Sequence, residues 1–520
     1  MLILLLAALA AAYGFYSYLL SPLFFSPLSR IPAPHWSCAI SSFWILRARK
    51  QFKENKTLSD AHSRHGPIVR VGPNTLSVDS VDAIRTIYQG GFDKWSWYSV
   101  FDFYGVPCVF SSLGSHEHGR RKRIVSRVYS KSYIQSSPAV RAQGRAILLG
   151  RLLPLLRREA ARSEGIEMQS IILSTTMDLI CAFNFGVQAG TNFLEDHESG
   201  RHWFDLYGYR FLHFFWPQEF PAFTSLCSKL GFRLYPSSVD EAHQEIEDWN
   251  KRMCDEARDV LAREKSDLPP QDEPIVLRAL YEGMEKAQEL KGDKAVPSKT
   301  TSTQHRHLEV ASETLDHVLA GFDTSGVALG FLIWQLSQDP DLQDKLRAEL
   351  LTVKAPSLDV LPESRDLDNL PLLHAVIMET LRRHPPIPGS QPRITPYPSS
   401  KIAGYQVPGG VRISAMAGPL HLDETVYPDP LRWDHTRWLP GVKSGGEMKQ
   451  MNRNFWAFGS GGRMCLGSNF AWNSLNQVTY LIYSNFRTSL VGHSSMEQMD
   501  AFVGRPKGEK LNVKLTPIGS

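Results

Sequence analysis

Near its C-terminus the chain reads Phe458-Gly459-Ser460-Gly461-Gly462-Arg463-Met464-Cys465-Leu466-Gly467. A single cysteine lies in this glycine-rich loop, and residues 469–472 are typical of the start of a helix. Glycine permits positive φ and lets the backbone approach a large flat ligand closely. The free N–H groups and the dipole of a helix N-terminus stabilise a thiolate. Arg463 adds a cation that we expect beside the cysteine, where it can also pair with an acidic group on a ligand.

A thiolate held in this way suits the axial position of haem iron, where it favours cleavage of the O–O bond. The spacing F-x-x-G-x-R-x-C-x-G is the haem-binding signature of the cytochrome P450 family, which the sequence resembles at every fixed position. Those positions are Phe458, Gly461, Arg463, the iron ligand Cys465, and Gly467. A buried, inert cysteine is the alternative, and five matched positions disfavour it. The resemblance implies a mainly α-helical cytochrome P450 fold with small β-sheets, in which a long central helix lies over heme b and the cysteine loop lies beneath.

The composition is that of a globular protein, with 42% hydrophobic and 21% charged residues in a chain of 520. A net charge of +4 is too small to indicate nucleic-acid binding. The six cysteines are scattered and contain no C-x-x-C pair. This pattern favours a reducing compartment over a disulfide framework.

Residues 2–25 carry no charge and are mostly Leu, Ala, Tyr and Phe. About 20 such residues span a bilayer, so we expect a transmembrane anchor over residues 1–25. A cleaved secretory signal is disfavoured because no basic residue precedes this long apolar run. The first basic residue is Arg30, and the positive-inside rule then places the body in the cytosol. We predict a single-pass protein of the endoplasmic reticulum membrane with a cytosolic catalytic domain.

Four prolines lie between residues 22 and 34, where they predict a stiff, non-helical connector. We assign residues 26–59 to this connector and the start of the body, and residues 60–520 to the haem-binding catalytic domain. Within that domain, residues 66–74 predict a turn, a short strand and a second turn, and residues 76–78 a partner strand.

A basic run, His118-Gly119-Arg120-Arg121-Lys122-Arg123, opens a helical pattern. It is either a solvated face or, by resemblance, the family's W-x-x-x-R helix, whose aromatic residue and arginine reach the haem propionates. One register places His118 and Lys122 at those positions, and the other places His116 and Arg120 there. Arg393 resembles the family's propionate-binding arginine. The basic face also suits an acidic redox partner.

Ten aromatic residues lie between Trp203 and Phe223. They are either ordinary core or, by their position in the resemblance, a mobile access region that touches the membrane and an apolar substrate. Residues 501–508 resemble the turn that closes the substrate pocket. Residues 264–308 are polar and predict an irregular connector with at most one helix, around residues 276–290.

A long apolar helix is predicted over residues 308–337, and its middle reads Ala320-Gly321-Phe322-Asp323-Thr324-Ser325. Small and polar residues are poor choices for a buried helix interior, and such exceptions often mark a site. All six positions fit the family motif [A/G]-G-x-[D/E]-T-[T/S]. By resemblance, Thr324 holds dioxygen and a water by hydrogen bonds, and Asp323 relays protons. Ala320 and Gly321 are expected to leave room over the haem plane.

Glu379 and Arg382 form an E-x-x-R pair, which places them on one helix face. The motif is weak alone, but it lies between the two motifs described above. By resemblance the pair is buried and structural, and it locks onto Arg437. His435 and Thr436 replace the family's Pro and Glu beside that arginine, so the three-residue contact depends on Arg437 reaching Glu379.

The resemblance implies a monooxygenase that hydroxylates or epoxidises an apolar small molecule, with O2 and NADPH-derived electrons as co-substrates. No flavin or dinucleotide fingerprint is evident, so we expect NADPH-cytochrome P450 reductase as partner, with cytochrome b5 as an optional second donor. The sequence is similar to fungal secondary-metabolism members that act on terpenoids such as sesquiterpenes, with polyketides a close second. The rivals are a haem-thiolate isomerase or peroxide-rearranging enzyme and a non-catalytic membrane haem protein. The Asp323-Thr324 pair disfavours both.

Overall fold

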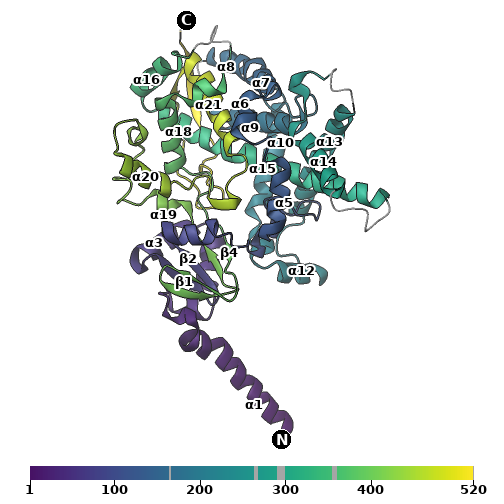
Figure 1. The fold of residues 1–520 in the computed structure, drawn as a ribbon, viewed down its shortest axis with the longest axis vertical. Helices are drawn as coiled ribbons and strands as arrows, with labels where there is room; N and C mark the ends of the chain where they lie inside the picture. Colours follow the sequence, from purple (N-terminus) through teal and green to yellow (C-terminus); the bar gives the residue numbers. More distant parts are fainter. Residues whose placement is uncertain (163–164, 263–267, 290–298, 354–359, 493, 519–520) are drawn as a thin grey trace.

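The structure is a computed structural model that describes residues 1–520 except 163–164, 263–267, 290–298, 354–359, 493 and 519–520. Helices make up most of the described chain, and the strands form small sheets, which confirms the predicted class. Figure 1 shows β1, β2 and β4 at the end of the molecule from which helix α1 projects, with the C-terminus at the opposite end.

The elements have the following bounds. The α-helices are α1 (Leu2–Phe15), α2 (Phe43–Lys50), α3 (Glu54–His65), α4 (Val81–Ile84), α5 (Ser115–Val125), α6 (Lys131–Ser136), α7 (Pro138–Gly144), α8 (Leu153–Ala160), α9 (Met168–Phe185), α10 (His197–Leu212), α11 (Phe215–Glu219), α12 (Pro221–Lys229), α13 (Ser238–Leu261), α14 (Ile275–Glu289), α15 (Lys299–Leu336), α16 (Pro340–Leu350), α17 (Ser364–Asp368), α18 (Pro371–Arg383), α19 (Ala417–His421), α20 (Gly445–Asn454) and α21 (Ser468–Asn485). The 3-10 and π-helical segments are η1 (Tyr16–Phe25), η2 (Pro27–Arg30), η3 (Trp36–Ala39), η4 (Arg85–Gln89), η5 (Ser96–Phe101), η6 (Arg145–Leu152), η8 (Pro270–Asp272), η9 (His435–Trp438) and η10 (Gly461–Arg463). The strands are β1 (Ile68–Gly72), β2 (Thr75–Val78), β3 (Ile166–Glu167), β4 (Arg393–Ile394), β5 (Ser399–Ile402), β6 (Tyr405–Pro408), β7 (Arg412–Ser414), β8 (Phe486–Leu490) and β9 (Asn512–Pro517).

The strands of the described chain form three sheets, ordered β1-β2-β7-β4, β3-β9-β8 and β5-β6. The predicted hairpin is present, because β1 and β2 pair antiparallel with Ile68 opposite Val78. Strand β2 then pairs parallel with β7. The segment expected to hold the connector and the start of the body contains α2 and α3, which bury Ile45 and Leu58 against Val69 of β1.

The N-terminal apolar segment stands outside the body. Helix α1 and segment η1 form a continuous stretch, Leu2–Phe25, with a mean hydropathy of 1.9 and none of it buried, as a membrane-spanning helix requires. The buried guanidinium of Arg70 in β1 donates hydrogen bonds to the carbonyls of Pro22, Ala39 and Pro73 at 2.8, 3.2 and 2.9 Å. Arg70 therefore ties the end of the apolar segment to the first sheet.

Helix α15 runs through the centre of the core. It begins at Lys299, nine residues before the predicted start, so the expectation of irregular structure up to residue 308 was wrong there. Helix propensity is a weak prior, and a polar stretch can extend a helix whose later turns are packed in a core. Helix α14 is the one helix predicted around residues 276–290.

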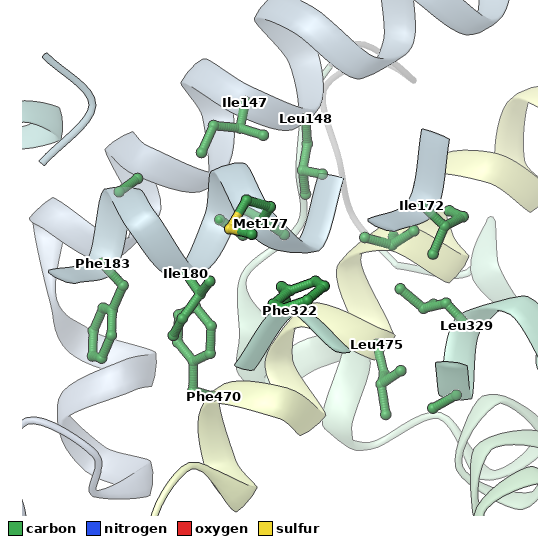
Figure 2. Close-up of a cluster of buried hydrophobic side chains, with 14 of the residues drawn as sticks. Ile147, Leu148, Ile172, Met177, Ile180, Phe183, Phe322, Leu329, Phe470 and Leu475 are labelled. Carbon is green, nitrogen blue, oxygen red and sulfur yellow. The ribbon is translucent and has the colours of Figure 1, made fainter. Parts of the chain in front are cut away.

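Helices α15 and α9 approach each other closely. A Cβ added at Gly321 would lie 2.5 Å from Cγ1 of Ile180, so this glycine is needed first for helix packing. The expectation that Gly321 serves to leave room over a cofactor is corrected accordingly. Figure 2 shows Ile180 in one apolar cluster with Phe322 of α15 and Phe470 of α21.

A fully buried ion pair joins Glu379 and Arg382 on α18. Two guanidinium N–H groups donate to the two carboxylate oxygens at 2.7 and 2.8 Å. Nε of Arg437 lies 3.5 Å from Oε1 of Glu379, so the expected three-residue contact forms despite the altered residues beside Arg437. The carboxylate also accepts hydrogen bonds from the indole of Trp438 and the backbone N–H of Asp434, at 2.9 and 2.8 Å.

The ion pair is connected to the cysteine loop through His421 at the end of α19. Arg382 donates to the carbonyl of His421 at 2.8 Å, and Nδ1 of His421 lies 2.9 Å from the carbonyl of Arg382. Nε2 of His421 accepts the backbone N–H of Trp456 at 2.8 Å, so the ring proton is on Nδ1. Burial, followed by the charge of Arg382, lowers the pKa of His421 to about 3 and keeps this ring neutral.

We predict that Glu379→Gln lowers the free energy of unfolding by about 3–5 kcal/mol, because the variant leaves the buried Arg382 without its counter-charge. Urea unfolding of the full chain in detergent measures this loss. The control is Arg487→Gln, which breaks an exposed pair with Asp344 (side chains 52% and 47% exposed) and should cost less than about 1 kcal/mol. Equal, small effects of both variants would contradict the structural role of Glu379.

Candidate active site

The cysteine loop, residues 458–467, contains η10 and leads directly into α21. The backbone N–H of Cys465 donates to the carbonyl of Phe458 at 2.9 Å, which closes the loop. Gly461 has a φ of +72°, and a Cβ at this position would overlap the backbone carbonyl of Tyr88. Only glycine satisfies both conditions without strain. The spacing of the motif is therefore explained by the local fold as well as by the needs of a ligand.

Lys122 contacts the cysteine loop. Its ammonium donates to the carbonyls of Gly462 and Met464 at 2.9 and 3.1 Å. The Cys465 side chain has accessible surface, but protein encloses its other sides, and this burial raises the pKa of the thiol. The Gly467 backbone and Lys122 act in the opposite direction.

The contacts of Lys122 and Arg463 differ from two of the expected positions. Arg463 was expected beside the cysteine, but its guanidinium donates to the carbonyls of Ser112 and Leu113 at 2.7 and 2.6 Å. Lys122 was expected at the haem propionates, but its hydrogen bonds go to the cysteine loop. Both corrections follow from the reach of long side chains, which sequence spacing does not determine.

The middle of α15 is open, whereas the stretches on either side of it are buried. Ala320 is exposed and Thr324 is half-buried, although residues 310–319 and 325–333 are all buried. The Thr324 hydroxyl donates to the carbonyl of Ala320 at 2.8 Å, which leaves the lone pairs of its oxygen free to accept a hydrogen bond. A flat ligand placed over this face would cover the accessible surface of Ala320.

Basic side chains converge beside this open face. The set comprises Lys94, His118, Arg393 and Arg463. Burial, followed by the charges of Arg463 and Lys94, lowers the pKa of His118 to about 3. Burial and the two arginines also hold the pKa of Lys94 well below its usual range. Lys94 and Arg393 both lie over the ring of Tyr98, 4.1 and 5.6 Å from its centroid.

This cluster fits the two propionates of haem. The acidic side chains beside it are Asp93, whose carboxylate lies 3.9 Å from Arg463, and the buried Asp316, whose pKa burial raises to about 7. Nε of Arg463 is buried and has no hydrogen-bond partner among the described residues. Converging buried cations are costly without an anion, and carboxylates match a guanidinium well. Sequence reasoning missed Lys94, because it stands in a loop without a motif and meets Arg393 only through a β-bridge.

The structure separates the two registers proposed for the basic helix. His118 of α5 is buried within the basic cluster. His116 is exposed, and Arg120 donates two hydrogen bonds to the carboxylate of Glu117 at 2.9 and 2.7 Å. The first register therefore brings its histidine to the site, and the second brings neither residue.

The partners of Asp323 lie outside the basic cluster. Its carboxylate accepts hydrogen bonds from Nε of Arg505 at 2.9 Å and from the hydroxyl of Tyr207 at 3.2 Å. Arg505 belongs to the segment that was expected to close the substrate pocket, and Tyr207 belongs to α10. Neither partner of Asp323 was anticipated from the sequence.

A cavity of about 440 Å³ opens between α2, α11 and the segment around Phe502. Its apolar wall includes Trp97, Phe101, Phe214 and Phe502, whereas Trp203 and Tyr207 belong to the core. The aromatic residues between Trp203 and Phe223 thus contribute to both the core and a ligand-sized cavity.

Two arginines hold α11 at the rim of this cavity. The Glu219 carboxylate lies 3.1 Å from Arg49 of α2 and 2.8 Å from Arg412 of β7. Burial opposes ionisation of Glu219, but the two arginines, Arg412 first, lower its pKa to about 2. The Glu219 carboxylate therefore stays ionised at physiological pH, and both of its ion pairs persist.

Comparisons with known proteins cover most of the chain as well as the site. The family model described as Cytochrome P450 matches residues 32–513. Cytochrome P450 monooxygenase avaI of Aspergillus versicolor is 28% identical over 435 residues, which cover 80% of this chain and 94% of that protein. Cytochrome P450 monooxygenase aflV of Aspergillus parasiticus is 26% identical over 514 residues, covering 96% and 93%. Fusicoccadiene C-8 hydroxylase of Alternaria brassicicola is 25% identical over 497 residues, covering 93% and 88%.

One architecture accounts for the cysteine loop, the open face of α15 and the match over residues 32–513. The two Aspergillus relatives, which cover 80% and 96% of this chain, are cytochrome P450 monooxygenases. The chain therefore belongs to the cytochrome P450 family of haem-thiolate enzymes, and it is a monooxygenase related to those of fungal secondary metabolism.

Proposed function

We propose that this protein is a membrane-anchored monooxygenase that hydroxylates or epoxidises an apolar small molecule in fungal secondary metabolism. The observation that carries the proposal is the open Ala320–Thr324 face, which lies between the buried stretches 310–319 and 325–333 of α15, together with the basic cluster and the cysteine loop. Haem bound there would supply dioxygen activation, and the thiolate would tune its electronics.

The chain's own residues then take the following roles. Cys465 would provide the axial thiolate, and Lys122 holds the loop around it. Lys94, His118, Arg393 and Arg463 would bind and orient the propionates. Thr324 would hold a water or an oxygen species through its hydroxyl, because that oxygen can still accept a hydrogen bond. Glu379, Arg382 and Arg437 act on the fold and have no contact with the reacting atoms.

The cavity suits an apolar substrate, because aromatic side chains form its wall. The Alternaria brassicicola relative is named for hydroxylation of fusicoccadiene, which supports a terpenoid substrate. A planar polyketide is the second candidate, because aromatic rings such as Trp97 and Phe502 also offer faces for stacking. Turnover of sesquiterpenes and aromatic polyketides with NADPH and its cytochrome P450 reductase tests the proposal. Product formed without NADPH and reductase would instead favour a rearranging enzyme.

We place the protein in the endoplasmic reticulum membrane with its body in the cytosol. The apolar Leu2–Phe25 segment supports the anchor, and Arg30 after it supports this orientation. Lys122 contacts the cysteine loop, and the nearby Arg123 and Arg127 are exposed. These arginines offer a basic surface to an acidic reductase or cytochrome b5.

We predict that Thr324→Ala uncouples NADPH consumption from product formation several-fold, because the variant removes the hydroxyl that holds a proton donor near dioxygen. Product and peroxide per NADPH consumed measure the effect. Thr324→Ser keeps the hydroxyl and should retain most of the coupling. Unchanged coupling in the alanine variant would remove Thr324 from the proton relay.

We predict that deletion of residues 1–25 releases most of the protein from membranes. Vesicle flotation measures the bound fraction. Exposed apolar residues of the α12 region, including Leu226, Leu230 and Phe232, should retain weak binding. Leu230→Ser in the deletion variant should then reduce the remainder. Undiminished binding after the deletion would contradict the anchor and point to the region around Trp216.

A further inference from the structure

We propose that Arg210 of α10 binds a carboxylate on the substrate, so that the apolar small molecule oxidised by this protein is an organic acid. This inference rests on the proposed monooxygenase function and names the substrate class more narrowly. Two observations carry it. Arg210 is a buried cation that forms no ion pair within the described part of the chain, and it lies directly behind the aromatic wall of the cavity.

The guanidinium of Arg210 has few polar partners for a buried charge. The residue is 2% exposed. Its Nη1 donates a hydrogen bond to Nδ1 of His243 at 2.8 Å, whereas its Nε has no hydrogen-bond partner among the described residues. Burial lowers the pKa of the guanidinium to about 10, which leaves it charged at neutral pH. A buried charge without a counter-ion is costly, so this position favours an anion.

The neighbouring acid, Glu247 of α13, is engaged with other groups. Because Arg210 can only donate, Nδ1 of His243 accepts, and the ring proton is on Nε2, which lies 3.2 Å from Oε1 of Glu247. The same oxygen accepts the backbone N–H of Tyr104 at 2.6 Å. The imidazole of His243 therefore separates Glu247 from the guanidinium, and Glu247 is not a direct counter-ion.

Aromatic rings surround the guanidinium. Its central carbon lies 5.7, 5.6 and 5.2 Å from the ring centroids of Phe103, Tyr207 and Phe214. Ring faces stabilise a cation, but they give its N–H groups no lone pair to bind. Two parallel N–H groups of a guanidinium match the two oxygens of a carboxylate. A carboxylate would therefore supply the acceptors that the rings lack.

Phe214 connects this position to the cavity. Its ring lies 6.0 Å from that of Phe101 and 5.5 Å from that of Phe211, and all three residues line the cavity. Phe214 is half-buried and stands in the short connection between α10 and α11. The guanidinium is thus one ring away from the cavity. We place the substrate's carboxylate where rotation of the Phe214 side chain would open the way to Arg210, with the apolar part in the cavity.

The arginines that line the cavity already have an anion. Arg49 and Arg412 both pair with Glu219, at 3.1 and 2.8 Å. Lys50 also lines the cavity and is exposed, so solvent screens its charge. An ion pair formed at the buried Arg210 is screened much less. Lys50 is therefore the rival receptor for a carboxylate, and substitution distinguishes the two positions.

Equilibrium dialysis tests the proposal with the full-length, haem-loaded protein in phospholipid nanodiscs, after subtraction of binding to empty nanodiscs. The probes are farnesoic acid and farnesol, which share an isoprenoid skeleton and differ in carboxylate against hydroxyl. The wild type should bind the acid more tightly. Arg210→Met should weaken binding of the acid about 10- to 100-fold and leave binding of farnesol unchanged. Arg210→Lys, which keeps the charge without the planar fork, should weaken it less.

Lys50→Gln is the matched control, and it should leave the binding of both probes unchanged. Loss of acid binding in Lys50→Gln, with wild-type binding in Arg210→Met, would place the carboxylate at the rim and overturn the proposal. Equal weakening of both probes in Arg210→Met would show a structural role only and also overturn it. A wild type that prefers farnesol would overturn it without any variant, so a variant that does not fold leaves the test decisive.

Phe214→Ala tests the way to Arg210. Removal of the ring should increase the ratio of acid affinity to alcohol affinity, because the guanidinium then faces the cavity directly. An unchanged or lower ratio would overturn access past Phe214.

Dialysis needs no turnover, so it separates this inference from the proposed function. A protein that prefers the acid but oxidises no substrate with NADPH and reductase would contradict the monooxygenase function and support the role of Arg210. A protein that oxidises sesquiterpene hydrocarbons but prefers farnesol to farnesoic acid would support the function and overturn the role of Arg210.

Discussion

The buried ion pair between Glu379 and Arg382 connects parts of the chain on which the cysteine loop depends. Its carboxylate accepts from Asp434 and Trp438, and its guanidinium donates to carbonyls around α19 and η9. His421 extends the same network to Trp456, two residues before the loop begins. A charge buried this deeply tolerates little displacement, because each lost partner leaves an unsatisfied group in the core. The network therefore fixes where the loop leaves the helical body.

Helix α15 combines two requirements that ordinarily conflict. It must pack closely enough on α9 that Gly321 has no room for a Cβ, and it must keep part of Ala320 and Thr324 accessible. Consecutive helix positions point about 100° apart, which lets Asp323 and Thr324 face different surroundings. The Asp323 carboxylate contacts Arg505 and Tyr207, while the adjacent Thr324 hydroxyl lies at the open face. Neighbouring residues of one helix thus have different surroundings.

Much of this arrangement was accessible from the sequence, because motifs with fixed spacing report local geometry. The cysteine loop and the long central helix belong to that class, whereas the contact of Arg437 with Glu379 was implied by the resemblance to the family. Contacts between distant residues that neither a motif nor the resemblance covers were not accessible. Lys94 reaches Arg393 across nearly 300 positions, and Arg505 reaches Asp323 from the end of the chain. Lys122 and Arg463 were recognised, but the contacts of their long side chains differ from those expected, since the fold decides which carbonyls lie within reach.

The carbon monoxide difference spectrum of the dithionite-reduced protein tests the central claim, that Cys465 provides a thiolate to haem in this site. We expect a Soret band near about 450 nm in the wild type and its loss in Cys465→Ser. A band near about 420 nm in the wild type would mean a neutral or different ligand. A band near about 450 nm that persists in Cys465→Ser would contradict the assignment of this cysteine directly.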